Sequence, residues 1–161
     1  MSNTFWTTTA ASSADETWQT PATVWTALDN EFGFTLDAAA LSGSTLVPGN
    51  WYGPDHQDST RHDALTRDWA ADANGGAVFC NPPYGRTTTW AFTDHACKMA
   101  DNGATVVLLI PARTDTRGFQ RLLERQAAGK AEVRFVAGRL KFGAVAGDPA
   151  PFPSAIVIVR P

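Results

Sequence analysis

The chain has 161 residues, of which 43% are hydrophobic and 18% are charged, and these values are typical of one soluble globular domain. No stretch approaches the roughly 20 consecutive apolar residues of a membrane span, and the polar first 17 residues lack the basic-then-apolar order of a signal peptide. Cys80 and Cys97 stand at no metal or redox spacing, so we expect no disulfide framework and a cytoplasmic location.

The net charge of −3 hides an asymmetry between the two parts of the chain. Residues 1–110 carry 4 Lys/Arg and 12 Asp/Glu, a net charge of −8, whereas residues 111–161 carry 9 and 4, a net charge of +5. A local basic face can bind phosphates even when the whole chain is acidic. The alternative is that these basic residues only keep one helix and the sheet edges solvated and bind no ligand.

The first part of the chain divides into a tail and the start of a domain. Residues 1–17, rich in Ser, Thr and Ala, are predicted to be a mobile tail, and residues 18–161 the domain. Thr20 and Pro21 are typical of an N-cap followed by proline at the first helical position, with Gly33 ending the helix. A short strand over 34–37 follows, and residues 41–74 show no strong periodicity.

Regular structure returns at residue 77. The pattern predicts strands over 77–80 and 105–110, the second ended by Pro111, and helices over 88–100 and 116–128. Strands over 132–137 and 155–159 close the chain, separated by a Gly- and Pro-rich loop in which a hairpin through residues 140–142 is the alternative.

Strands and helices alternate from residue 77 onward, which predicts βαβ units in a mostly parallel sheet of the α/β class. Ligands of such sheets bind at the carboxyl ends of the strands. Asp37, the turn after residue 80 and the turn from Pro111 to Arg113 all fall at such ends. We therefore expect three strand ends to supply polar groups to one rim.

The turn Asn81-Pro82-Pro83-Tyr84 is the most informative motif. Two prolines fix two φ angles near −65° and bias Asn81 toward an extended conformation. The Asn81 amide and the Pro82 carbonyl could accept the N–H groups of an amine on a planar ring, and Tyr84 could stack on that ring. The pattern thus favours methyl transfer to a planar nitrogen substrate; a merely rigid turn is the alternative.

Seven segments carry a resemblance to a known family. They are WQTP (18–21), EFGFTLDAAA (31–40), DALTRDW (63–69), CNPPYG (80–85), LLIPARTDTRGF (108–119), EVRFVAGRLKFG (132–143) and PFPSAIVIV (151–159). Together and in this order they resemble the phage-type, Dam-like DNA adenine-N6 methyltransferases. The resemblance implies a compact Rossmann-like domain that uses S-adenosylmethionine on DNA and is encoded by a phage or prophage in a bacterial host.

The resemblance also implies roles for individual residues. Asn81, Pro82, Pro83 and Tyr84 would form the catalytic turn that holds and stacks on a flipped adenine. The cofactor would be bound by the following residues: Asp37, Asp63, Thr20, Pro21 and Trp18. The glycine-rich pattern usual after the first strand of methyltransferases is replaced by alanines at 38–40, and for each aspartate a helix cap or turn is the alternative.

Basic residues in the second part of the chain are candidates for DNA contact. Arginines recur every four residues at 113, 117, 121 and 125, which predicts a basic helix face. We expect Arg113 and Arg117 to contact DNA, although Arg113 could instead lie at the active rim and the face could simply be solvated. Arg139 and Lys141, between Phe135 and Phe142, form a second candidate cluster.

Other functions stay open on the sequence alone. The same turn also occurs in glutamine-N5 and RNA methyltransferases, so a methyltransferase that acts on glutamine N5, RNA adenine or cytosine N4 is an alternative. The altered first motif also leaves room for a catalytically inactive DNA- or cofactor-binding module. No metal site is expected, because the spacing of His56, His62 and Cys80 matches no zinc pattern.

Overall fold

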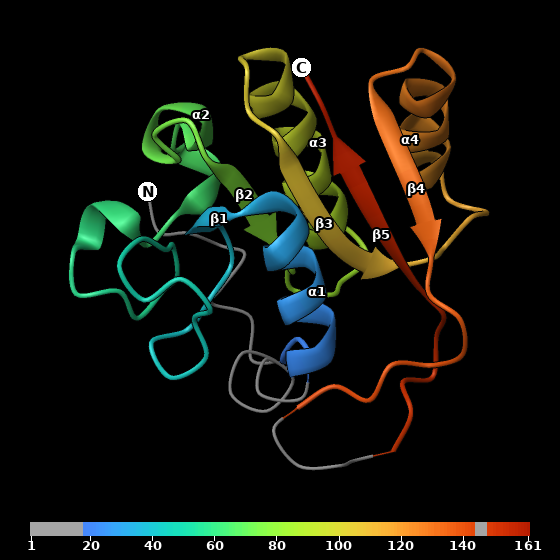
Figure 1. Ribbon diagram of the computed structural model, residues 1–161, viewed down its shortest axis with the longest axis horizontal. Coiled ribbons are helices and arrows are strands. Elements are labelled where there is room, and N and C mark those ends of the chain that lie inside the picture. The colour runs from blue at the N-terminus through green and yellow to red at the C-terminus, as the bar shows by residue number, and fades with distance from the viewer. Residues whose placement is uncertain (1–17, 144–147) are drawn as a thin grey trace.

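The computed structural model describes residues 18–143 and 148–161. A five-stranded sheet in the order β1-β2-β3-β5-β4 forms its centre, as Figure 1 shows. Its strands are β1 (Phe34–Asp37), β2 (Ala77–Cys80), β3 (Val106–Pro111), β4 (Ala131–Phe135) and β5 (Ser154–Val159). The predicted tail, residues 1–17, lies outside the described residues.

The sheet is mixed: the expected parallel pairing is confirmed for the first three strands, and β5 is the strand that departs from it. β1, β2 and β3 pair in parallel, but β5 is inserted between β3 and β4 and is antiparallel to both. A parallel return to the sheet needs a crossover, usually a helix. The described residues between β4 and β5 contain no helix and no strand, so the chain reverses and β5 runs back along β4.

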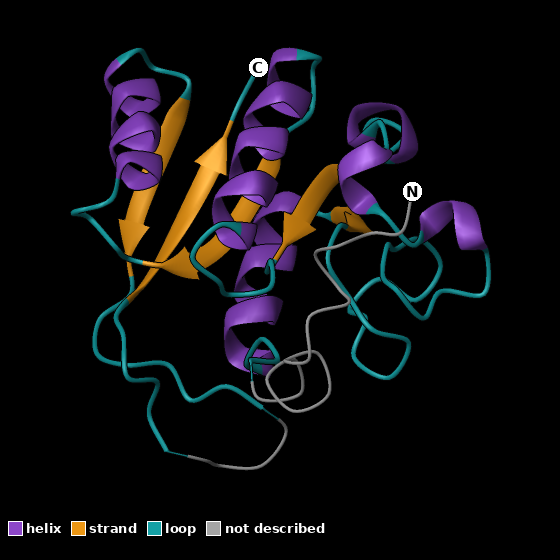
Figure 2. Cartoon of the chain, turned by 180° about the vertical axis from the view of Figure 1, so that it is seen from behind, coloured by secondary structure: helices purple, strands orange, loops and turns teal. Residues whose placement is uncertain are grey.

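Helices cover both faces of the sheet (Figures 1 and 2). α1 (Ala22–Phe32) packs on one face, where Leu28 joins Phe79 and Leu109 in one hydrophobic core. α3 (Thr88–Asp101) and α4 (Arg117–Ala127) pack on the other face, where a second core includes Phe92 and Leu122. The sheet is therefore the middle layer of three.

The two central strands are buried on both faces. Every residue of β2 and β3 is buried, and successive residues alternate between the two cores, as the two-residue period of a strand requires. Val78 and Leu108 face the core with α3, whereas Phe79 and Leu109 face the core with α1. Continuous apolar runs of this kind are typical of parallel strands covered by helices.

Three short helices lie in the segment for which the sequence showed no periodicity. They are η1 (Ser59–Arg61), η2 (Ala64–Thr66) and α2 (Trp69–Asp72). Asp58, Asp63 and Asp68 are their N-caps, and each carboxylate accepts a backbone N–H of its own helix. These helices are too short to produce an amphipathic pattern, but the three aspartates are a capping signal that the sequence does carry.

Other described features bear on membrane and metal binding. No helix in residues 18–143 and 148–161 has the length and apolarity needed to span a membrane. Within the same residues, no cluster of His, Cys, Asp or Glu could hold a metal ion. Cys80 and Cys97 are free thiols.

Candidate active site

Two adjoining hollows lie along the carboxyl edge of the first three strands. The first is at the ends of β1 and β2 and occupies about 530 Å³, its open mouth included; among its lining residues are Asp37 and residues 81–84. The second lies toward the end of β3 and is lined by Arg86, Trp90 and Arg113, among others. Trp18 and Tyr84 line both hollows and form the wall that they share.

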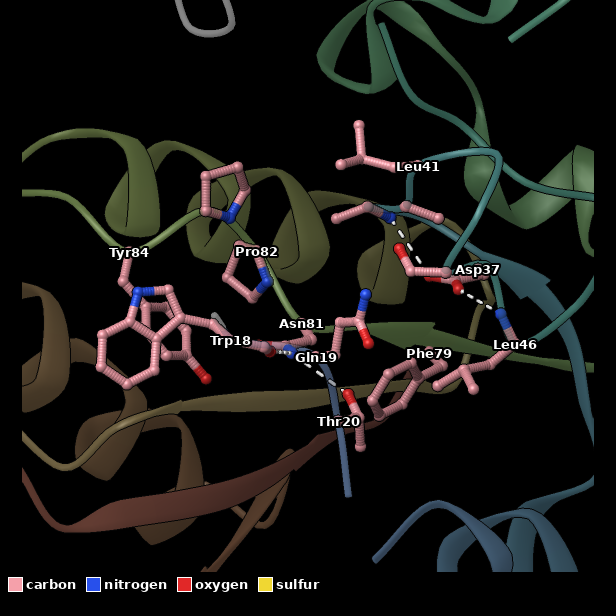
Figure 3. Close-up of a pocket in the computed structure, with 14 residues that line it drawn as sticks. Trp18, Gln19, Thr20, Asp37, Leu41, Leu46, Phe79, Asn81, Pro82 and Tyr84 are labelled. Atoms are coloured by element: carbon pink, nitrogen blue, oxygen red, sulfur yellow. Dashed lines mark hydrogen bonds between the residues drawn. The ribbon is translucent and has the colours of Figure 1, made fainter. Parts of the chain in front are cut away.

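Asn81 follows β2 directly, and its side-chain amide is held from one side. Nδ2 donates to the Trp18 carbonyl oxygen at 2.7 Å and to the Thr20 hydroxyl oxygen at 3.1 Å. Figure 3 shows both bonds at one end of the first hollow, with Asp37 at the other end. The turn and the segment before α1 are thereby joined.

Two acceptors in this turn have no hydrogen-bond partner among the described residues. Asn81 Oδ1 is buried and unpaired, and the Pro82 carbonyl makes no hydrogen bond there either. By contrast, the Pro83 carbonyl accepts the Thr89 hydroxyl at 3.2 Å. An unpaired buried acceptor costs about 1–3 kcal/mol, which is the kind of cost that proteins retain at functional positions.

The structure corrects the prediction that Thr20 is the N-cap of the first helix. α1 begins at Ala22 and its N-cap is Pro21, which provides no side-chain hydrogen bond. The Thr20 hydroxyl lies at Asn81 instead. Pro21 is not among the residues that line the first hollow, whereas Trp18, Gln19 and Thr20 are.

Asp37, the last residue of β1, is only 3% exposed and lines the first hollow. Its carboxylate accepts the backbone N–H groups of Leu46 at 3.0 Å and Ala39 at 3.4 Å. Burial raises the pKa of this carboxyl to about 6, against the opposing effect of these hydrogen bonds. Asp37 therefore both closes the loop that follows β1 and places a titratable carboxyl at the hollow.

The alanines that replace the expected glycines form a tightly packed turn. Ala38 N–H donates to the Phe79 carbonyl at 2.8 Å, and Ala40 N–H donates to the Tyr52 carbonyl at 2.9 Å. Gly53 packs against this turn so closely that a Cβ added there would lie 1.8 Å from the Ala40 carbonyl oxygen. The small residue that permits close backbone approach is thus present, but on the neighbouring segment.

Tyr84 lies within an aromatic cluster, and its phenol donates to the Leu109 carbonyl at 3.2 Å. Trp18 packs against its ring with centroids 5.8 Å apart, and Phe142 and Phe152 meet it edge-on at 6.0 and 5.4 Å. The ring keeps surface in both hollows. Its stacking on a base stays a prediction.

The arginines spaced four apart do not share one environment. Arg121 pairs with Asp94 at 2.9 Å and Arg125 with Asp101 at 3.0 Å, and both pairs tie α4 to α3. Arg113 and Arg117 are exposed, and their side chains have no hydrogen bond or ion pair among the described residues. The basic face is therefore split into two structural arginines and two free ones.

Other predicted site residues lie outside the two hollows. Asp63 lines neither of them, and its carboxylate accepts the Leu65 N–H at 3.0 Å as the N-cap of η2. Arg139 reaches the Ala150 carbonyl at 3.5 Å, and Lys141 is exposed without a described partner. Their binding roles stay predictions.

Several residues of the two hollows were missed by sequence reasoning, among them Gln19, Arg86 and Trp90. Gln19 lines the first hollow between two residues that were predicted, so its position within WQTP was an available signal. Arg86 and Trp90 line the second. Trp90 packs flat on Gly118 at the start of α4, where an added Cβ would lie 2.2 Å from its ring, and no local pattern reveals such a contact.

Comparison with known families identifies this arrangement. Residues 7–156 match the model of the family described as DNA N-6-adenine-methyltransferase (Dam). The chain belongs to this family. The match covers most of the chain and includes both hollows, so the resemblance carried by the seven segments is confirmed, and with it a methyltransferase of the DNA adenine-N6 class.

The Dam family is named after the reaction that its members catalyse, and the site geometry agrees with that reaction. Its name states the acceptor, the N6 amine of adenine in DNA, and the unpaired acceptors at residues 81 and 82 are suited to hold an amine. No curated protein matches the chain.

Proposed function

We propose that the chain transfers a methyl group from S-adenosylmethionine to the N6 amine of adenine in DNA, in a Rossmann-like domain. The observation that carries the proposal is that the buried Asn81 Oδ1 and the neighbouring Pro82 carbonyl have no partner among the described residues, in a hollow that Asp37 also lines. The resemblance to phage-type, Dam-like methyltransferases supports a phage or prophage origin and a cytoplasmic location in the bacterial host.

The first hollow is placed where a cofactor is expected. It lies at the carboxyl ends of parallel strands, where such sheets bind ligands. When bound, S-adenosylmethionine supplies a methyl group on a positively charged sulfur. Asp37 offers a carboxylate for a cationic or hydroxyl group, and Trp18, Gln19 and Thr20 line the same hollow.

Asn81 and Pro82 would act on the target amine. The lone pair of an exocyclic adenine amine is delocalised into the ring, so the amine is a poor nucleophile. Accepting its two N–H groups on Asn81 Oδ1 and the Pro82 carbonyl draws the nitrogen toward tetrahedral geometry and localises that pair. The same fixed acceptors stabilise the positive charge that develops on the nitrogen.

DNA would approach from the second hollow. A target base must leave the duplex, at a cost of a few kcal/mol, and stacking on Tyr84 would offset part of it, about 1–3 kcal/mol. Arg86 and Arg113, both exposed, line this hollow, and neither side chain has a partner among the described residues. They are suited to bind the phosphates beside the flipped nucleotide. Phosphates farther along the DNA would be contacted by Arg117, Arg139 and Lys141.

The decisive experiment is methylation of unmethylated DNA with labelled cofactor, followed by nucleoside analysis. We expect N6-methyladenine from the wild type and at least a hundredfold less from Asn81→Ala, because a lost acceptor at the reacting charge typically costs about that factor. Asn30→Ala, a change of an exposed asparagine in α1, should keep wild-type activity. Equal product from both asparagine variants would refute the proposal.

The same assay separates the remaining alternatives. Product on cytosine, on RNA or on a glutamine-containing peptide, with none on DNA adenine, would assign the site to another planar amine or amide. Cofactor binding by calorimetry without any methylation would indicate an inactive module.

A further inference from the structure

The amide of Asn81 can adopt only one orientation in this site. Nδ2 faces the Trp18 carbonyl oxygen at 2.7 Å, and a carbonyl oxygen accepts hydrogen bonds but cannot donate them. Rotating the amide by 180° would set two acceptors against each other. The hydrogen-bond network therefore determines which terminal atom of the amide is the oxygen.

The second acceptor for Nδ2 is the Thr20 hydroxyl, whose oxygen lies 3.1 Å from this nitrogen. A threonine before proline at a helix start ordinarily caps the helix, a contact worth about 1 kcal/mol. Here α1 has no side-chain cap, so the hydroxyl is engaged at Asn81 instead. The fold forgoes a local stabilising contact for one that spans 61 residues.

The segment that carries both acceptors, residues 18–20, is itself fixed by contacts with the rest of the fold. The Trp18 ring packs against Tyr84, Phe142 and Phe152, with centroid distances between 4.9 and 5.8 Å. The Gln19 carbonyl accepts the Gly143 N–H at 3.0 Å. The two groups that face Asn81 are therefore fixed in place by packing and by a backbone hydrogen bond.

We infer that the Thr20 hydroxyl and the Trp18 carbonyl are positioning groups that orient the Asn81 amide, so that its oxygen and not its nitrogen meets the target N–H. This inference rests on the proposed function and differs from the cofactor contact that the family resemblance implies for Thr20. Nδ2 is fully occupied, and among the residues that the structure describes none occupies Oδ1, so the oxygen is left open for the target.

The test compares Thr20→Val, which is nearly isosteric but has no hydroxyl, with Thr20→Ser, which keeps it. Thr23→Val is the matched control, because Thr23 is exposed at the start of the same helix. Single-turnover methylation is measured at saturating DNA and cofactor, and the cofactor Kd is measured separately by calorimetry.

We expect Thr20→Val to slow the single-turnover rate about tenfold or more, with the cofactor Kd within about twofold of wild type. Thr20→Ser and Thr23→Val should keep rates close to wild type. The inference is overturned if Thr20→Val keeps the wild-type rate, if Thr20→Ser loses as much, or if the loss is matched by a weaker cofactor Kd, which would make Thr20 a cofactor ligand.

A readout without turnover keeps the inference separate from the proposed function. The side-chain NH₂ protons of Asn81, assigned in ¹⁵N-labelled protein by their loss in Asn81→Ala, should be protected from solvent exchange. In Thr20→Val the proton that faces residue 20 should shift and exchange about tenfold faster, and in Thr23→Val it should not. Unchanged exchange overturns the inference, whereas a wild type that methylates no DNA refutes only the proposed function.

Discussion

The carboxylate of Asp37 accepts a hydrogen bond of 3.0 Å from the backbone N–H of Leu46, nine residues farther along the chain. The loop between them lines the first hollow, and Asp37 is nearly inaccessible to solvent. The same carboxyl thus closes a loop and carries a pKa raised by burial to about 6. We therefore expect stability, and the cofactor binding that we propose for Asp37, to depend on pH.

The stability contribution of Asp37 should fall as pH rises. In the unfolded chain its pKa is near 3.8, and in the folded protein it is about 6. Between these values the folded state binds more protons, so deprotonation of Asp37 progressively favours unfolding. From pH 5 to 7.5, wild type should lose about 1 kcal/mol of unfolding free energy relative to Asp37→Asn. Urea denaturation of both proteins measures this, and parallel pH profiles would contradict it.

Cofactor affinity should change with pH in the opposite direction. If the Asp37 carboxylate contacts the cofactor, the bound state favours the deprotonated form, and at pH 5 only about a tenth of the carboxyl is ionised. The calorimetric Kd for S-adenosylmethionine should therefore be about tenfold weaker at pH 5 than at pH 7.5. In Asp37→Asn this difference should disappear; its persistence would exclude Asp37 as the titrating group.

The free and paired arginines of the α4 region should differ in DNA binding. Arg113→Gln and Arg117→Gln should each weaken DNA binding and lower the slope of log Kd against log salt by about one, because each would remove one of the phosphate contacts that we propose. The slope is measured by fluorescence anisotropy on a labelled duplex.

Arg121→Gln is the matched control on the same helix. Arg121 is committed to Asp94, in a surface pair of which both side chains are half exposed, so its loss should cost at most about 1 kcal/mol of stability and leave the salt slope unchanged. A slope change as large as that of Arg113→Gln would mean that the ion pair opens on DNA.

Asn81→Asp should create a pH-dependent enzyme. One carboxylate oxygen would stand where Nδ2 lies, 2.7 Å from the Trp18 carbonyl, and only the protonated acid could donate to that carbonyl. Repulsion and burial would raise the pKa of the new carboxyl. The activity ratio of variant to wild type, at saturating cofactor, should therefore fall about tenfold or more between pH 5.5 and 8.5. A constant ratio would contradict the assigned amide orientation.

Gly53→Ala should destabilise the loop that follows β1. The added methyl group would lie 1.8 Å from the Ala40 carbonyl oxygen, and this backbone atom can move only with the whole turn. We expect a loss of roughly 2 kcal/mol or more in unfolding free energy. Gly49→Ala, where an added Cβ meets nothing within 4 Å, should change stability by about 0.5 kcal/mol at most. Equal effects of the two changes would contradict the packing.

Several features of the fold and the site could be predicted from local sequence. Glycine, proline and the apolar runs between them predicted α1 and the strands β1 to β3 to within one or two residues, because these elements are long or strongly patterned enough for local propensity to decide them. The Asn81 turn follows one such strand directly and Asp37 ends another, so their meeting at one edge was predictable from sheet geometry alone.

The remaining features depend on contacts between residues far apart in the chain. β5 pairs antiparallel with two strands at once, and the described part of the connection from β4 contains no crossover helix. The basic stripe was divided by aspartates on α3, which lie 24 to 27 residues away along the chain. Neither outcome leaves a signal at the residues concerned.

The sequence by itself determined the chemistry of the turn, because two prolines fix the backbone that presents Asn81 and Pro82. Only the tertiary structure decided which atom of the Asn81 amide is available. That choice is made by Trp18 and Thr20, some 60 positions earlier in the chain, and a hydrogen-bond acceptor at such a distance acts only once the chain has folded.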